Sequence, residues 1–170
     1  MTQLKQQIKS LLSDNPSLGT HELATQLNKP EGEIIRFLPE HIVSIIEGQY
    51  SETILTELPQ WGEVTIIIEK AGSFFEIKET FPIGKSAYGY YNLNLGEETV
   101  KTFHGHLKLD HIKYIALVSK PLKGKETHAI VFISDKNQVV FKVYLGRNKQ
   151  GEIYPDQIER FQQLTQYILQ

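Results

Sequence analysis

Residues 112–146, "IKYIALVSKPLKGKETHAIVFISDKNQVVFKVYLG", contain three stretches that read as β-strands, at 112–120, 128–134 and 138–146. Each stretch is bounded by Gly, Pro, Asn or Asp, which are typical of turns. The connection "DKNQ" at 135–138 is short, and no helical stretch separates the three strands. Because a parallel crossover needs a dozen or more residues, neighbouring strands here are expected to pair antiparallel.

The strand pattern also extends upstream. From Trp61 onward, apolar residues recur at every second position, as expected for β-strands. "WGEVTIIIEK" (61–70) and "SFFEIKETF" (73–81) predict a hairpin around "KAGS". "AYGYYNLNL" (87–95) and "TVKTFHGHLKL" (99–109) predict further strands. Downstream, "DQIERFQQLTQYIL" (156–169) predicts a C-terminal helix packed on the sheet. Its apolar stripe consists of Ile158, Phe161, Leu164 and Ile168.

Residues 1 to about 47 are predicted to be helical. "LKQQIKSLL" (4–12) and "THELATQLN" (20–28) have apolar residues at helical spacing, with Thr20 as the expected N-cap. "KPEGEIIRFLPE" (29–40) predicts a third short helix that opens near Pro30 and closes before Pro39. The expected class is α+β: a helix-turn-helix-like segment (1–50), then a large antiparallel sheet with a C-terminal helix (51–170), together one compact unit.

The composition excludes several classes of protein. The 170 residues contain no cysteine, so there is no disulfide scaffold and no thiolate metal site. Apolar runs such as "AIVFI" (129–133) are far shorter than the ~20 residues of a membrane span, and the N-terminus lacks the apolar core of a signal peptide. The net charge is −2, and the candidate recognition segment carries Glu31, Glu33 and Glu40 against Arg36 alone, which disfavours DNA binding.

Three of the six histidines lie in "FHGHLKLDH" (103–111). In an extended 103–108 segment, His104, His106 and Lys108 share one face. Two imidazoles about 7 Å apart beside an ammonium group suit an anionic, metal-bearing ligand. The alternative is a solvated strand face. A bare zinc site has less support, because no third ligand is assured nearby.

Aromatic and basic residues supply further candidates. In "SAYGYYNL" (86–93), Tyr88 and Tyr90 are predicted to share a strand face, either as packing residues or as phenolate ligands for ferric haem. Gly89 and Gly105 would let a flat ligand approach the backbone, or mark a bend. The basic residues of the "SKPLKGKETH" turn and the residue that follows "VYLG" offer cations to ligand carboxylates, or are solvated. They are Lys120, Lys123, Lys125 and Arg147. The familiar catalytic motifs are mostly absent, which favours binding over catalysis.

Several segments in order resemble the haem-utilisation cytosolic carriers of the HutX/ChuX group. They are "WGEVTIIIE", "FEIKETFPIGK", "GYYNL", "GHLKLDHIKYIALVSKPLKGKETHAIVFI" and "FKVYLGR". That family is related to one half of the larger HemS-type haem proteins. The resemblance implies a cytoplasmic, homodimeric protein of Gram-negative bacteria that binds haem as cargo after import. It also implies delivery to a downstream haem-degrading partner. The charge and the short apolar runs add the expectation of no nucleic-acid partner and no membrane insertion.

The family's Gly-His-Leu/Ile-Lys/Arg histidine matches His106 in "GHLK". A second histidine of some members falls on Glu69, and the family's "PFMG" loop reads "PLKG" (121–124) here. The resemblance therefore implies His106 as the iron ligand, or a phenolate from Tyr88 or Tyr90, or one of each. Lys108, Lys125 or Arg147 would pair with the propionates. Two further alternatives stay open: an enzyme acting on haem or a tetrapyrrole product, and a haem-responsive regulator.

Overall fold

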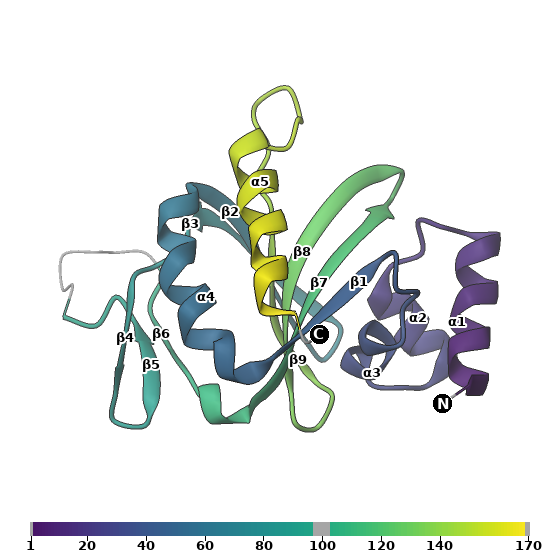
Figure 1. Ribbon diagram of the computed structural model, residues 1–170, viewed down its shortest axis with the longest axis horizontal. Helices are drawn as coiled ribbons and strands as arrows, with labels where there is room; N and C mark the ends of the chain where they lie inside the picture. Colours follow the sequence, from purple (N-terminus) through teal and green to yellow (C-terminus); the bar gives the residue numbers. More distant parts are fainter. Residues whose placement is uncertain (1, 97–102, 169–170) are drawn as a thin grey trace.

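In the computed structural model, which describes residues 2–96 and 103–168, the described strands form two antiparallel sheets (Figure 1). The large sheet has the strand order β1-β7-β8-β9-β2-β3. Its strands are β1 (Val43–Glu47), β2 (Glu63–Lys70), β3 (Ser73–Thr80), β7 (Ile112–Leu122), β8 (Lys125–Ser134) and β9 (Val139–Tyr144). The small sheet has the order β4-β5-β6, with β4 (Gly84–Ala87), β5 (Tyr90–Leu93) and β6 (Gly105–Leu107). The predicted α+β class with a large antiparallel sheet is confirmed.

At its central strands β7 and β8 the large sheet buries both of its faces, whereas the edge strand β3 is mostly exposed. On β7, Ile115 and Leu117 join a core cluster that includes residues of the C-terminal helix, whereas the alternate residues Ala116 and Val118 join a second cluster with the N-terminal helices. In a strand that is covered on both faces, the side chains that point to either face are buried, so apolar and polar residues do not alternate. This two-sided burial explains why β7 and β8 read as nearly continuous apolar runs.

Three helices cover one face of the large sheet: α1 (Thr2–Asp14), α2 (Thr20–Leu27) and α3 (Glu31–Arg36) (Figure 1). All three were predicted, including the opening of α3 after Pro30. The prediction of Thr20 as N-cap is wrong, because Gly19 is the N-cap and its N–H donates to the Glu22 carboxylate over 2.8 Å. Thr20 is instead the first helical residue, and its hydroxyl donates to Glu31 over 2.6 Å.

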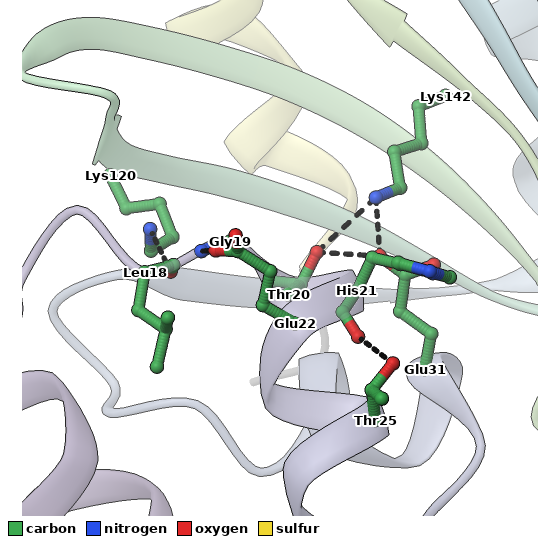
Figure 2. Close-up of polar contacts among 9 residues, drawn as sticks. All are labelled: Leu18, Gly19, Thr20, His21, Glu22, Thr25, Glu31, Lys120 and Lys142. Carbon is green, nitrogen blue, oxygen red and sulfur yellow. Dashed lines mark hydrogen bonds and ion pairs between the residues drawn. The ribbon is translucent and has the colours of Figure 1, made fainter. Parts of the chain in front are cut away.

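Two buried lysines fix these helices to the sheet (Figure 2). Lys142 of β9 pairs with Glu31 at the start of α3, and its Nζ also lies 3.2 Å from the Thr20 hydroxyl. Lys120 of β7 donates to the carbonyl of Leu18, just before α2, over 2.8 Å. The interpretation of Lys120 as a turn cation for a ligand is therefore wrong, since its ammonium group is used inside the structure.

The other face of the sheet packs against α4 (Ser51–Glu57), α5 (Pro155–Gln163) and the 3-10 turn η4 (Leu164–Tyr167), with the small sheet beside them (Figure 1). Phe161 and Leu164 are buried, and Ile158 and Ile168 pack against the same cluster. The predicted helical stripe is therefore confirmed for Ile158, Phe161 and Leu164, whereas Ile168 lies beyond the helical turns in an extended conformation and forms a β-bridge with Ile46.

Three details differ from the sequence-based predictions. Residues 43–47 form β1 and pair with β7, so the helical segment predicted to about residue 47 ends earlier. Helix α4 was not predicted, because its seven residues are too few for a clear helical period. The strand predicted over 87–95 is a hairpin, since β4 ends at Ala87 and β5 begins at Tyr90. Of the strand predicted over 99–109, residues 99–102 lie outside the described residues.

Among the described residues, none of the helices combines the length and apolar character that a membrane crossing requires.

Candidate functional site

A tight turn at Tyr88 and Gly89 connects β4 to β5, with Ala87 paired to Tyr90. Both turn residues have positive φ, 57° at Tyr88 and 79° at Gly89, as in the type I′ turns that match the twist of a hairpin. The same geometry recurs at Ala71–Gly72 and Lys123–Gly124. Ala71 and Lys123 are exposed as well, but only Tyr88 places a large aromatic residue, 90% accessible to solvent, at this turn position.

The two faces of the small sheet have different roles. Tyr91 and Leu93 of β5 are buried in the core, and Leu107 of β6 packs against them as the register partner of Tyr91. The alternate residues Tyr90 and His106 point outward and are both exposed. The predicted alternation of residues 103–108 is thus confirmed, although β6 itself spans only Gly105–Leu107: Phe103 and Leu107 pack against the core, whereas His104 and His106 are exposed.

Tyr88 and Tyr90 do not share a strand face, contrary to the prediction. Tyr88 occupies the turn, with φ in the left-handed region, while Tyr90 begins β5. The prediction failed because "SAYGYYNL" alternates like a strand, although the Tyr-Gly pair reverses the chain within it. Tyr88 is an exposed residue at the tip of the hairpin.

The outward face carries an aromatic and basic cluster of Tyr90, His106 and Lys108. The rings of Tyr90 and His106 meet edge to face, with centroids 6.0 Å apart and planes at 70°. Lys108 lies over the Tyr90 ring, with its Nζ 4.8 Å from the centroid, and donates to the Gly89 carbonyl over 2.9 Å. A cation over the face of a phenol ring is attracted by the negative face of the ring.

Asn92 connects His106 to the hairpin. Asn92 and His106 are register partners in β5 and β6, and the Asn92 Oδ1 lies 2.6 Å from the His106 Nδ1. The Asn92 amide nitrogen lies within 3.1 Å of the carbonyl oxygens of Lys85, Ala87 and Tyr90. Asn92 is buried, whereas His106 is exposed. Sequence reasoning missed Asn92, because a single amide in a strand leaves no periodic signal.

A shallow cleft of about 370 Å³ opens beside the cluster. Its lining includes Glu52 of α4, Ser86, Gly89, Tyr90, Tyr91 and Asp110. The Ser86 hydroxyl donates to the Glu52 carboxylate over 2.8 Å. Burial raises the pKa of Tyr91, so the phenolate form of this residue is disfavoured. Tyr88 and Tyr90 are therefore the better phenol candidates.

The other predicted site residues lie elsewhere or at the margin. His104 is exposed and precedes β6 directly. Lys125 begins β8, and Arg147 follows β9 and donates to the carbonyls of Glu126 and Gly151. The β7–β8 turn lies at the opposite side of the molecule from the small sheet (Figure 1). The structure thus brings Tyr90, His106 and Lys108 together but does not bring Lys125 or Arg147 to them.

The two glycines have structural roles. Gly89 needs its positive φ, and a Cβ there would lie 3.2 Å from the Lys108 Nζ. A Cβ on Gly105 would point toward Leu93, on the core side of the sheet. Gly105 therefore does not clear the outward face for a flat ligand, contrary to the prediction. Glu69, the residue that departs from the family pattern, accepts a hydrogen bond from the Gly72 N–H over 2.6 Å in the β2–β3 turn.

Residues 44–164 match the family model described as haem utilisation ChuX/HutX. The chain belongs to this family. It is 45% identical over 166 residues to the intracellular heme transport protein HutX of Vibrio cholerae serotype O1, covering 98% of this chain and 84% of the relative.

Solved structures agree with this membership. The structure of the heme binding protein ChuX superposes with a TM-score of 0.81 at 25% identity, covering 94% of this chain and 97% of ChuX. The heme degrading enzyme ChuS of Escherichia coli O157:H7 gives a TM-score of 0.73 at 13% identity, covering 94% of this chain but 47% of ChuS. This second likeness shows that the chain shares its fold with about half of the larger protein.

Proposed function

We propose that this chain is a cytosolic, homodimeric haem carrier that accepts imported haem and delivers it to a haem-degrading partner. The observation that carries the proposal is the exposed cluster of Tyr90, His106 and Lys108, found in a chain of the haem utilisation family. Haem is the cargo of the site. The relatives named as a heme transport protein and a heme binding protein support the same assignment.

The chemistry of the cluster fits ferric haem. His106 offers an imidazole to the iron, and Tyr90 or Tyr88 offers a phenol oxygen, both known ligand types for haem iron. Lys108 offers an ammonium group to a propionate. A hydrogen bond to the ring nitrogen that does not bind metal, as Asn92 makes with His106, is the usual support of a ligating imidazole.

The exposure of the cluster fits a carrier better than a permanent haem protein. His106 and Tyr90 are solvent-exposed, and Tyr88 is almost fully so. An open site with one or two protein ligands favours fast dissociation, and differences in affinity between related complexes lie mostly in the dissociation rate. Moderate affinity would allow the cargo to leave for the next protein.

Titration of ferric haem into the purified protein, followed by the Soret band, tests the proposal. We expect a saturable spectral change at one haem per chain that differs from haem in buffer. His106→Ala should shift the spectrum and weaken binding, whereas the control His41→Ala, at an exposed histidine preceding β1, should match the wild type. Unaltered haem spectra on addition of the wild-type protein would contradict the proposal.

The phenol ligand is tested by three matched substitutions. Tyr88→Phe and Tyr90→Phe each remove one exposed phenol, and Tyr91→Phe removes the neighbouring buried one as a control. Loss of charge-transfer absorption in one of the first two variants would identify a phenolate ligand. Delivery is tested by mixing the haem complex with excess apomyoglobin, where transfer within seconds to minutes is expected and retention over hours would contradict a carrier role.

A further inference from the structure

We infer that Asn92 fixes the tautomer of His106, so that Nδ1 carries the proton and Nε2 carries the lone pair. The inference rests on the proposed function only for the identity of the metal that Nε2 would meet. Asn92 would act as a positioning residue, through His106, without touching the ligand itself.

The orientation of the Asn92 amide is set by its surroundings. Its Nδ2 lies 2.9 Å from the Ala87 carbonyl oxygen and 3.1 Å from those of Lys85 and Tyr90. A carbonyl oxygen only accepts, so the group that faces it must be the NH₂ end of the amide. A flipped amide would place its oxygen against three other oxygens in a buried site. The Oδ1 of Asn92 therefore faces His106.

That orientation decides the proton on the imidazole. The Oδ1 of an amide has no hydrogen, and it lies 2.6 Å from the His106 Nδ1. A hydrogen bond at this distance requires Nδ1–H as the donor. In the neutral imidazole only one nitrogen carries a proton, so Nε2 keeps the lone pair that binds metals. The edge contact with Tyr90 then limits rotation of the ring.

Asn92 also connects His106 to the turn that carries Tyr88. Ala87 and Tyr90 flank the Tyr88–Gly89 turn, and Asn92 donates to the carbonyls of both. The side chain that orients His106 therefore also holds the hairpin that carries Tyr88. This arrangement would place imidazole and phenol on one rigid support rather than on separate loops.

The first arm of the test uses the ligand-free protein. Long-range ¹H–¹⁵N spectra of the histidine rings, recorded well above the ordinary histidine pKa of about 6.5, distinguish the two neutral tautomers. We expect a protonated Nδ1 and an unprotonated Nε2 for His106, with assignment from His106→Ala. In Asn92→Ala this pattern should give way to a mixture. A wild-type His106 with its proton on Nε2 would overturn the inference, whether or not the protein binds haem.

The second arm asks whether Asn92 acts through His106, using a double-mutant cycle on haem affinity. Removing the support of a metal-binding histidine typically lowers affinity about ten- to a hundred-fold, which we expect for Asn92→Ala. The same change in the His106→Ala background should have little further effect. Equal losses in both backgrounds would show that Asn92 only holds the hairpin, and would overturn its positioning role. Wild-type protein that keeps the predicted tautomer but binds no haem would instead refute the proposed function alone.

Discussion

Lys142 of β9 and Glu31 of α3 form an ion pair whose side chains are 11% and 9% exposed. The pair joins the N-terminal helices to the large sheet, far from Tyr90 and His106 along the chain. Removing one member leaves the other charge buried without a partner, which destabilises a protein by roughly 3–5 kcal/mol. We predict a loss of this size for Glu31→Gln or Lys142→Met, measured by urea unfolding.

The exposed pair Lys29–Glu33 provides the matched control. Its atoms are 3.7 Å apart and its side chains are 45% and 23% exposed, so Glu33→Gln should change stability by about 0.5 kcal/mol or less. The double variant Glu31→Leu with Lys142→Met should lose much less than the sum of the single losses. Equal effects of Glu31→Gln and Glu33→Gln would contradict the account of how the helices are attached.

The turn residue Tyr88 gives a prediction that separates stability from binding. A left-handed conformation costs a non-glycine residue roughly 1–2 kcal/mol, and Asn tolerates it best. Tyr88→Asn should therefore raise the free energy of unfolding by about 1 kcal/mol. Ala71→Asn, in the equivalent turn of the β2–β3 hairpin, should do the same. Only Tyr88→Asn should weaken haem binding, and an equal effect of both on haem would contradict a role for Tyr88.

The lowered pKa of Lys120 should make the stability of the protein depend on pH. Burial, and secondarily the charge of Lys142, lowers the pKa of Lys120, while Glu22 opposes that shift. Between the lowered pKa and the ordinary lysine value of about 10.4, the unfolded chain binds more protons than the folded one. The free energy of unfolding should therefore rise with pH across this window.

Urea unfolding at pH values from neutral to about 10 measures this slope. Above about pH 10 the buried Tyr91 and the half-buried Tyr144, whose pKa values are raised by desolvation, act in the opposite direction. Lys120→Met should lose the rise, whereas the control Lys123→Met, at an exposed turn position, should keep it. An unchanged slope in Lys120→Met would assign the pH dependence to other groups.

Gly48 and Gly105 should respond differently to alanine. A Cβ on Gly48 would overlap the carbonyl oxygen of Ile112, so Gly48→Ala should destabilise the protein by roughly 1–3 kcal/mol. A Cβ on Gly105 would meet Leu93 at an ordinary 3.6 Å, so Gly105→Ala should change stability by less than about 1 kcal/mol. Because that Cβ faces the core, haem affinity should also be unchanged; a large loss of affinity would mean that the ligand contacts this strand from the other side.

The strands β7, β8 and β9 could be predicted from sequence because each is a long apolar run between turn residues. Strand β1 was read as helical, since its five residues follow three helices and show no clear period of two. The division into a large and a small sheet could not be predicted, because the pairing of strands distant in the chain, such as β1 with β7 and β2 with β9, leaves no signal in a single sequence.

The parts of the site that depend on side-chain alternation within one strand could be predicted from the sequence. The parts that depend on which distant segments meet in the fold could not. His106 and Lys108 were assigned to one face from their spacing, and Tyr90 joined them because β5 and β6 are neighbours. Lys125 and Arg147 share the basic chemistry but lie at the other end of the strands, which spacing along the chain cannot reveal. The role of Asn92 could not be predicted from the sequence, because it depends on three backbone carbonyls that a turn brings together.

The location of the haem site is tested most directly by mapping backbone amide shifts while adding gallium(III) protoporphyrin IX, a diamagnetic analogue of ferric haem. The account predicts that the largest changes fall on residues 84–93 and 105–110, with the large sheet and the N-terminal helices little affected. Changes concentrated instead on the groove beside α1 and α3, around Phe37 and His41, would contradict it.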